Sequence, residues 1–409
     1  MIADKKETEY DNKQKSLVNS PIPEEGWIPI WIEQKLKNNG ISPRWAKRAC
    51  HRIIREWNNT PISSNIKKWG IRRGFLPSTI VLYHLNEDNY SHFLSDIDYY
   101  RLHPLNNHFV FWINDKITLK YIFSQPICIN KQRKEFVNLM PDYFLYIEND
   151  GHYSYLMDVP NYIKKDSYFL LHLLQDKGRL AMKPSNGGGG YGFVDLIYKN
   201  NEIFWNQENI SQTEFNKRKS GLNGYIVTAY ITQNHAFDEV WDKSVATLRI
   251  IAVKQIDDTF NGGHIDIISS YIRFGTYSSD GACNMHTGGV AIHYDPDTGE
   301  YGDFFFRYPG FGEEGQTRYD AHPDTHCCLK GKKLPHHEKV KDAVIAICEH
   351  LSSLQYFGID LVVTEEGIQL LEINSLPAIS SPQSLEGPLF KNPKAAQFFH
   401  RKLSEIENK

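Results

Sequence analysis

The stretch MKPSNGGGGYGFVDL (residues 182–196) contains a lysine, then four glycines in a row, an aromatic residue and a fifth glycine. Consecutive glycines are costly to order, because glycine loses much backbone freedom on folding and offers no side chain for packing. Without side chains, however, neighbouring backbone N–H groups can converge on a phosphate oxygen, and Lys183 adds a nearby positive charge. The stretch therefore predicts a flexible lid over a triphosphate.

The residues on either side of the glycines predict two strands. In GRLAMKP (178–184), alternation places Ala181 and Lys183 on one face, and GFVDLIY (192–198) returns as the second strand. The glycines match G-x-G-x-x-G-x-V, but H-R-D and D-F-G of protein kinases are missing, and so is the P-loop pattern. A dinucleotide-binding fold would need a helix to begin at the third glycine, where a strand follows instead. A plain surface hairpin is the alternative interpretation of this motif alone.

A second informative stretch is FGIDLVVTEEGIQLLEINSLP (357–377), which predicts a β-hairpin. Thr364 and Ile368 can close a three-residue loop, with Gly367 in the left-handed conformation. This register pairs Val362 with Leu370.

The same register places two carboxylates, those of Asp360 and Glu372, directly opposite each other, where like charges repel. A divalent cation would turn this repulsion into a binding site. Asn374 points to the same face and adds a neutral oxygen, and oxygen ligands of this kind suit Mg²⁺. An ordinary hairpin with polar outward residues is the alternative.

Composition limits the classes of function. The chain has 409 residues, 41% of them hydrophobic, and a formal net charge of −3, which does not favour nucleic acid or an anionic membrane as a partner. The basic run PRWAKRACHRIIREW (43–57) is interpreted as a solvated helix face. Six scattered cysteines and the lack of a signal peptide indicate a cytoplasmic protein with reduced thiols, and no apolar run is long enough to span a membrane.

The order of elements predicts an α+β fold. We expect a disordered tail (1–20), a mostly helical, aromatic-rich N-terminal region (21–114), a lid subdomain (115–231) and a C-terminal subdomain with the metal site (232–409). A buried strand is expected over 107–115, a helix near 131–139 and a long helix over 338–355. The remaining expected strands cover 143–148, 179–183, 192–198, 225–231, 246–253, 266–274 and 288–294.

At this point the chain resembles the ATP-grasp superfamily, in particular its sugar-transfer-associated branch. Besides the glycine-rich and carboxylate stretches, the matching motifs are WGIRRGF (69–75), NDK (114–116), TLRI (247–250), NMHTGG (284–289) and HPDT (322–325). The resemblance implies an ATP-grasp fold, in which ATP is held between two β-rich subdomains and Mg²⁺ bridges its phosphates. Together the motifs cover roughly residues 65 to 390, in order.

The resemblance also implies roles for individual residues. Lys116 and Lys183 correspond to the two nucleotide lysines, and TAYI (228–231) corresponds to the hinge that binds adenine. Many relatives begin this hinge with glutamate, so the ribose contact is left open among Asn234, His235, Asp238 and Glu239. The metal ligands are Asp360, Glu372 and Asn374. The full set expected to bind the cofactor is Lys116, Lys183, Asn186, Gly187, Gly188, Gly189, Gly190, Tyr230, Ile231, His235 and Asp238.

Two arginines are candidates for catalysis together with Lys183. Arg249 alternates onto an otherwise apolar strand, where a buried guanidinium needs an anionic partner. We interpret it as a clamp on a transferring phosphoryl group, with a structural salt bridge as the alternative, and apply the same logic to Arg273. Asn284 and His286 are expected either to line the acceptor pocket or to form a bare turn.

A zinc site within HPDTHCCLKGKKLPHH (322–337) is disfavoured, since its histidines and cysteines lack a recognised four-ligand spacing.

The implied function is an ATP- and Mg²⁺-dependent ligase that activates a carboxylate as an acyl phosphate, releases ADP and joins the carboxylate to an amine. The branch name suggests polysaccharide or specialised-metabolite biosynthesis. The partners are then a small-molecule carboxylate and an amine, with homo-oligomerisation left open. A small-molecule kinase on the same scaffold and a nucleotide-binding module without turnover are the alternatives.

Overall fold

The computed structural model describes residues 28–129, 134–148, 151–187, 189–256, 263–279, 282–310 and 317–407. The chain divides into two compact units. One comprises Met1–Tyr90, Leu94–His103 and Leu403–Lys409, and the other Ser91–Phe93 and Pro104–Lys402. The tail that we expect to be disordered (1–20) lies outside the described residues.

The first unit is helical, as expected from the sequence. The longest of its complete helices, α3, begins at Pro43, which suits the first helical position because proline has no N–H to leave unpaired. The helix buries Ala46, Ala49 and Ile53 on one side, while its basic residues Arg44 and Lys47 are exposed. The helices of this unit are α2 (Ile28–Asn38), α3 (Pro43–Asn59), α4 (Ser64–Arg72), α5 (Pro77–Leu82) and α6 (Asp96–Arg101).

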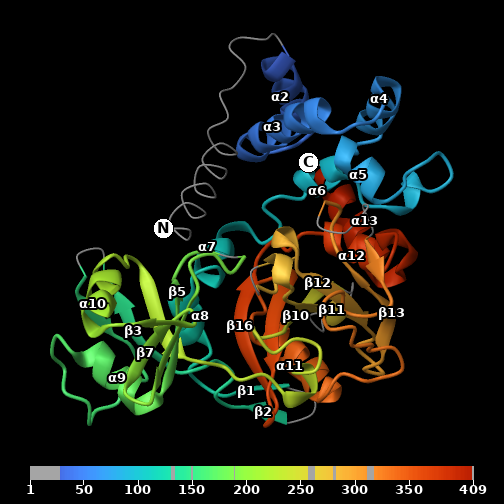
Figure 1. Ribbon diagram of the computed structural model, residues 1–409. Helices are drawn as coiled ribbons and strands as arrows, with labels where there is room; N and C mark the ends of the chain where they lie inside the picture. Colours follow the sequence, from blue (N-terminus) through green and yellow to red (C-terminus); the bar gives the residue numbers. More distant parts are fainter. Residues whose placement is uncertain are drawn as a thin grey trace. The chain divides into compact units, whose positions relative to one another are not determined.

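The second unit contains two seven-stranded sheets, both antiparallel throughout (Figure 1). The first, which carries the glycine-rich loop, has the order β4-β3-β9-β5-β6-β7-β8. Helix α9 (Phe169–Lys177) packs against β5 and β6, and α10 (Gln212–Ser220) packs against β7. The strands are β3 (Tyr143–Ile147), β4 (Tyr153–Tyr155), β5 (Arg179–Pro184), β6 (Val194–Lys199), β7 (Glu202–Trp205), β8 (Glu208–Ile210) and β9 (Tyr225–Ala229).

The second sheet, which carries the carboxylates, has the order β14-β13-β12-β11-β10-β15-β16. One face is apolar: Leu248 and Ile250 on β10 are fully buried in the same core as Val344 and Ile347 of helix α11 (His337–His350). Alternation along β10 therefore directs Arg249 to the opposite face. The strands are β10 (Thr247–Gln255), β11 (His264–Phe274), β12 (Val290–Tyr294), β13 (Tyr301–Phe306), β14 (Arg318–Tyr319), β15 (Tyr356–Val363) and β16 (Ile368–Asn374).

The remaining elements complete this unit. They are β1 (Ile127–Ile129), β2 (Lys134–Phe136), α7 (Val110–Ile113), α8 (Lys116–Ile122), α12 (Ser380–Leu385), α13 (Pro393–Glu407, which continues into the first unit), and the 3₁₀ turns η1 (Tyr90–His92), η2 (Asn107–Phe109), η3 (His235–Phe237), η4 (Tyr277–Ser279), η5 (Met285–Thr287) and η7 (Leu389–Lys391).

Two of the expected elements are wrong. The apolar run over 107–115 is not a buried strand but a 3₁₀ turn followed by the short helix α7. Phe111 within it is 78% exposed, and periodicity alone cannot tell a short strand from a helical turn. Residues 134–136, within the expected helix near 131–139, form a strand because Cys128 and Glu135 pair across β1 and β2; residues 130–133 lie outside the described part.

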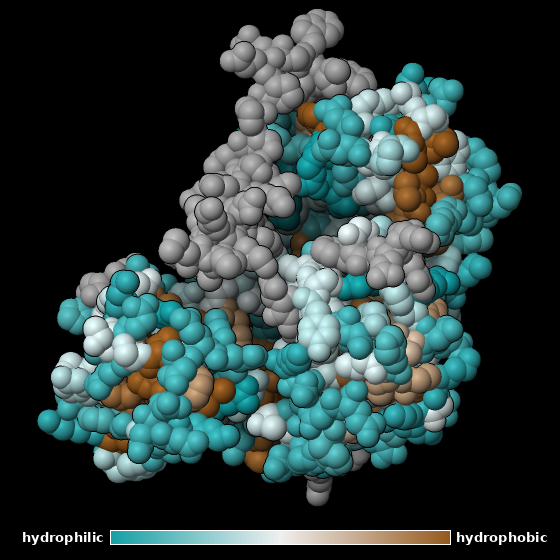
Figure 2. All heavy atoms as spheres, in the orientation of Figure 1, coloured by the Kyte–Doolittle hydropathy of each residue, from teal (hydrophilic) through white to brown (hydrophobic). Residues whose placement is uncertain are grey.

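The protein is thus of the α+β class, with a helical N-terminal region and two antiparallel sheets. Most of the described surface in Figure 2 is hydrophilic. Within the described part of the chain, no helix has the length and apolarity needed to cross a membrane.

Candidate functional site

The β15–β16 hairpin places Asp360 and Glu372 directly opposite each other, as the sequence predicts. Asn374 lies beside both carboxylates: its Nδ2 is 3.3 Å from Asp360 Oδ2 and 3.3 Å from Glu372 Oε1. The three residues assigned to metal binding therefore form one cluster.

The expected register of this hairpin is only partly correct. Val362 pairs with Gln369 rather than Leu370, and the loop has four residues, 364–367, rather than three. Gly367 has φ +155°, which is not the left-handed helical conformation that we expect. A bulge between Asp360 and Leu361 restores the pairing of the carboxylates, because an extra residue on β16 shifts the register by one.

Both candidate arginines contact Asp360, which is only 3% exposed. Arg249 donates from Nε to Oδ1 at 2.5 Å and from Nη2 to Oδ2 at 2.9 Å, and Arg273 Nη2 lies 3.1 Å from Oδ1. Burial by itself raises the pKa of Asp360, but the charges of the two guanidinium groups outweigh burial and hold this pKa at about 2. The anionic partner that Arg249 requires is therefore present within the protein, and a role in clamping phosphate stays a prediction.

Lys116 links Glu372 to the glycine-rich loop. Its Nζ lies 3.6 Å from Glu372 Oε2 and donates to the carbonyl oxygen of Gly187 at 2.6 Å. The lysine occupies the first turn of α8, which Asp115 caps by accepting a hydrogen bond from the Thr118 N–H at 2.7 Å. The sequence pair Asp115-Lys116 thus combines a helix cap with a positively charged group that faces the site.

Lys183 lies on β5 and is half-buried. No hydrogen bond or ion pair joins its ammonium group to any described residue. Burial and then the nearby charge of Lys116 lower the pKa of Lys183 to about 8, although Glu372 opposes this shift. An ammonium group that is partly desolvated and unpaired is suited to receive an anion.

The glycine-rich loop adopts conformations that other residues rarely take. Gly187, Gly189 and Gly190 have φ of +142°, +76° and +76°, while Gly188 lies outside the described residues. Asn284 Nδ2 donates to the carbonyl oxygen of Gly189 at 2.8 Å, and Asn186 is exposed. The loop is therefore held through two of its carbonyl oxygens, by Lys116 and by Asn284.

The donor set fits a hard divalent cation. Two carboxylates and one amide converge within hydrogen-bonding distance, and oxygen ligands of this type are those that Mg²⁺ prefers. The amide of Asn374 can offer its oxygen instead of its nitrogen by turning about its last bond. Asp360, Glu372 and Asn374 would hold the ion.

The profile of the sugar-transfer associated ATP-grasp family matches residues 108–393. The chain belongs to this family. The match includes every residue that we assign to the site. It begins after the N-terminal segments of the first unit and ends before most of α13. No curated protein sequence matches the chain.

Solved structures of ATP-grasp enzymes are similar to the chain at low identity. D-alanyl-alanine synthetase A from Vibrio cholerae O1 biovar eltor str. N16961 is 13% identical with a TM-score of 0.37, over 76% of this chain and 67% of that chain. D-alanine–D-alanine ligase from Bacillus anthracis is 15% identical with a TM-score of 0.33, over 72% and 66%. The ADP complex of PurK, an N5-carboxyaminoimidazole ribonucleotide synthetase, is 10% identical with a TM-score of 0.36, over 70% of this chain but only 52% of that chain.

The residues expected to form the hinge, 228–231, begin within β9 and continue past its end. Tyr230 packs against Arg179, whose guanidinium carbon lies 3.5 Å from the ring centre, and Ile231 is 9% exposed. Arg179 also forms a bidentate pair with Asp195 on β6, at 2.8 and 2.7 Å.

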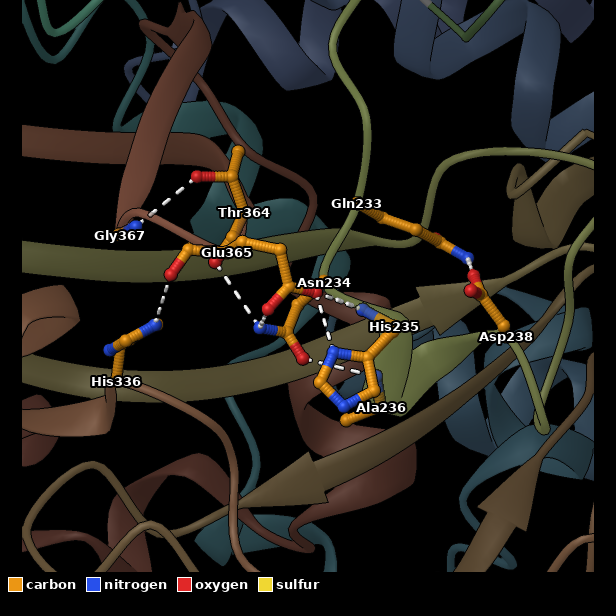
Figure 3. A network of polar contacts seen from close by, with 9 residues as sticks. All are labelled: Gln233, Asn234, His235, Ala236, Asp238, His336, Thr364, Glu365 and Gly367. Atoms are coloured by element: carbon orange, nitrogen blue, oxygen red, sulfur yellow. Dashed lines mark hydrogen bonds and ion pairs between the residues drawn. The ribbon is translucent and has the colours of Figure 1, made fainter.

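The residues after the hinge are tied to the loop of the β15–β16 hairpin (Figure 3). His235 donates its backbone N–H to Glu365 Oε1 at 2.6 Å, and its Nδ1 lies 2.7 Å from the same oxygen. The hydrogen bond to Glu365 raises the pKa of His235. Asp238 accepts a hydrogen bond from Gln233 Nε2 at 3.0 Å. Among the described residues, neither His235 nor Asp238 contacts Asp360 or Glu372, so their assignment to ribose binding stays a prediction.

The histidine of the HPDT motif has structural partners. His322 is fully buried, its Nε2 lies 2.9 Å from the carbonyl oxygen of Gly275, and its Nδ1 accepts from the Asp324 N–H at 3.3 Å. Both ring nitrogens of His322 are therefore engaged. Among the described residues, no group of three or more His, Cys, Asp or Glu is arranged to hold a metal. In the NMHTGG motif, His286 stacks on Tyr308 with a centroid distance of 4.9 Å.

Sequence reasoning missed several contacts at the site. Asn114, immediately before the Asp115-Lys116 pair, accepts a hydrogen bond from the Ser375 N–H at 3.3 Å, next to the metal cluster. Tyr143 on β3 is fully buried, and its hydroxyl has no hydrogen-bond partner among the described residues. The NDK motif gave a signal for Asn114, whereas nothing in the strand pattern distinguishes Tyr143.

Proposed function

We propose that the protein is an ATP- and Mg²⁺-dependent ligase that activates a carboxylate as an acyl phosphate and joins it to an amine. The observation that carries the proposal is the charge of the cluster. Two carboxylates, Asp360 and Glu372, lie close to four cationic side chains: Lys116, Lys183, Arg249 and Arg273. The surplus of positive charge, together with an unpaired Lys183, supports a site for a polyphosphate.

In the proposed reaction, a carboxylate oxygen of the substrate attacks the γ-phosphorus of ATP, and the bond from this phosphorus to the β–γ bridging oxygen breaks. The products are an acyl phosphate and ADP. The amine then attacks the acyl carbon, inorganic phosphate leaves, and the nitrogen loses a proton to give an amide. Bound Mg²⁺ would neutralise charge on the phosphates.

The residues of the chain act mainly by positioning and by neutralising charge, which are the main requirements of phosphoryl transfer. Lys183 and Lys116 would bind phosphate oxygens, and the glycine-rich loop would cover them and exclude water. Arg249 and Arg273 orient Asp360 and would stabilise the negative charge that develops during transfer. Adenine would contact the backbone at Tyr230 and Ile231. We place this reaction in polysaccharide or specialised-metabolite biosynthesis, in the cytoplasm, with small molecules as the two substrates.

The proposal is tested by ADP release with Mg-ATP across a panel of amino acids, uronic acids and sugars. Hydroxylamine traps acyl phosphates as hydroxamates, and a Lys183→Ala variant serves as the blank. Carboxylate-dependent ADP with hydroxamate supports the ligase. ADP that depends on a hydroxyl substrate, without hydroxamate, would instead indicate a kinase, and AMP would overturn the proposed mechanism. A wild-type protein that binds Mg-ATP but turns over nothing would favour a binding module.

A further inference from the structure

The side chain of Tyr143, at the start of β3, is fully buried, yet its hydroxyl has no hydrogen-bond partner among the described residues. Burying an unpaired hydroxyl destabilises a fold, because the group loses its hydrogen bonds with water and gains none. Phenylalanine would fill the same space without this cost. A tyrosine here therefore needs an explanation that the protein without ligand does not supply.

Strand pairing shows which sheet face carries this tyrosine. Tyr143 lies opposite Thr228 on β9, and Thr228 lies opposite Ala181 on β5. Residues that are directly opposite share a face, and Lys183 follows Ala181 by two residues on the same face. Tyr143 thus stands on the face that carries the unpaired lysine, in a cross-strand row with the first residue of the hinge motif, Thr228.

The packing of the two cores agrees with this placement. Tyr143 belongs to the core shared with the carboxylate-bearing sheet, together with Ile226, the cross-strand partner of Lys183. Its neighbours Phe144 and Leu145 belong to the other core, together with residues of α9. The ring therefore lies on the face of the first sheet that also carries Lys183.

The tyrosine is also held rigidly. Its backbone N–H donates to Asp158 Oδ2 at 2.8 Å, and its carbonyl oxygen accepts from the Asp158 N–H at 3.1 Å. The ammonium group of Lys120 lies 5.7 Å from the ring centre and pairs with the same Asp158 at 2.9 Å. Burial, and then the negative charges of Glu372 and Asp115, raise the pKa of Tyr143, so its hydroxyl stays protonated and can donate.

We propose that the Tyr143 hydroxyl donates a hydrogen bond to an oxygen of the bound nucleotide, between the hinge and the phosphate-binding lysines. The inference rests on the proposed function, since it needs a nucleotide in this site. It makes Tyr143 a binding residue whose unpaired hydroxyl is satisfied only in the complex.

The test is the affinity of a Tyr143→Phe variant for Mg-ADP, measured by calorimetry, together with its thermal unfolding midpoint. We expect binding about tenfold weaker than in the wild type, which corresponds to the loss of one hydrogen bond. The unfolding midpoint without ligand should be unchanged or higher, because the deleted hydroxyl has no partner there. A purely structural role would instead predict unchanged affinity for Mg-ADP and a lowered unfolding midpoint.

A matched control is Tyr294→Phe on β12. The hydroxyl of Tyr294 is also buried without a hydrogen-bond partner among the described residues. Its neighbour His293 pairs with Tyr271, which pairs with Arg249, so alternation places Tyr294 on the sheet face turned away from Asp360. This variant should bind Mg-ADP as the wild type does.

Equal affinity of Tyr143→Phe and the wild type would overturn the inference, and so would a lowered unfolding midpoint or an equal loss of affinity in Tyr294→Phe. If the wild type itself fails to bind Mg-ADP, the proposed function is wrong and the inference is wrong with it. The wild type alone reveals a failure of the proposed function, whereas a failure of the Tyr143 inference alone requires the variants, so the two are distinguishable.

Discussion

Arg249 and Asp360 stand opposite each other on β10 and β15 and form a bidentate ion pair, with Nε–Oδ1 at 2.5 Å and Nη2–Oδ2 at 2.9 Å. The planar fork of arginine matches both carboxylate oxygens, so the pair fixes the orientation of the acid. Arg273 adds a third contact, at 3.1 Å. A cation bound to Asp360 would therefore meet a carboxylate that is already oriented.

Breaking this pair should destabilise the fold. Asp360 is 3% exposed, and removing one partner of a buried ion pair leaves an uncompensated charge, which typically costs about 3–5 kcal/mol. We expect Arg249→Ala to lower the free energy of unfolding by about 3 kcal/mol, since Arg273 still faces the acid, as measured by urea denaturation. Arg179→Lys provides the control, because it changes a bidentate pair with Asp195 whose arginine side chain is 41% exposed, and exposed pairs contribute about 1 kcal/mol or less. A loss below 1 kcal/mol in Arg249→Ala would contradict this prediction.

Glu372 offers the cleaner test of the metal site, because it has no bidentate partner to lose. The Glu372→Gln variant keeps the shape of the side chain but removes a negative charge and weakens an oxygen ligand. We expect Mg²⁺ to strengthen ADP binding in the wild type and to have little effect in the variant, in titrations with and without the metal. Binding of metal-free ADP should be equal or tighter in the variant, since less negative charge faces the phosphates. An undiminished effect of Mg²⁺ would argue against Glu372 as a ligand.

Lys183 should make nucleotide binding depend on pH. Its pKa is lowered to about 8, and only the protonated form attracts phosphate. Affinity for Mg-ADP should therefore be high below pH 8 and fall as pH rises from 8 to 9.5, by up to about tenfold per pH unit if one proton is required. In Lys183→Arg the guanidinium stays charged throughout, so this decline should disappear. A wild-type profile as flat as that of the arginine variant would contradict the assignment.

Variants at two neighbouring glycines of the lid distinguish the effect of backbone strain from the effect of steric contact. Gly189 and Gly190 both have φ +76°, so alanine imposes similar strain at either position. A Cβ at Gly189 would lie 3.0 Å from the ring of Tyr191 and 3.2 Å from Asn284 Nδ2, whereas a Cβ at Gly190 would meet nothing within 4 Å.

We therefore expect Gly189→Ala to slow turnover more than Gly190→Ala does, and Gly189→Val to slow it further, with the unfolding midpoint nearly unchanged in all three. The measurement is the steady-state rate of ADP release. Full activity in Gly189→Val would show that this loop is not the lid.

The sequence predicted the parts of the site that depend on motif and alternation. Asp360, Glu372 and Asn374 converge as expected, although the loop length was wrong, because a β-bulge cannot be seen in an alternating pattern. The sequence leaves the role of Arg249 open between a structural ion pair and a phosphate clamp. Only the pairing of β10 with β15 shows that its partner is Asp360.

The parts that could not be predicted depend on contacts between distant segments. The apolar run before Asn114 resembles a strand, yet it forms a 3₁₀ turn and a single turn of α-helix. The hydrogen bond between His235 and Glu365 joins residues 130 positions apart. The unpaired hydroxyl of Tyr143 becomes evident only when the strands are aligned in the structure. Neither has a local signature in the sequence.

The most direct test of the central claim follows oxygen from the carboxylate substrate to phosphate. The carboxylate that supports ADP release is labelled with ¹⁸O in both oxygens, and the phosphate released with the amine product is analysed by ³¹P NMR or mass spectrometry. An acyl phosphate intermediate requires one ¹⁸O atom in each phosphate released, together with ADP. Unlabelled phosphate, a stable phosphorylated product, or AMP as the nucleotide product would contradict the account.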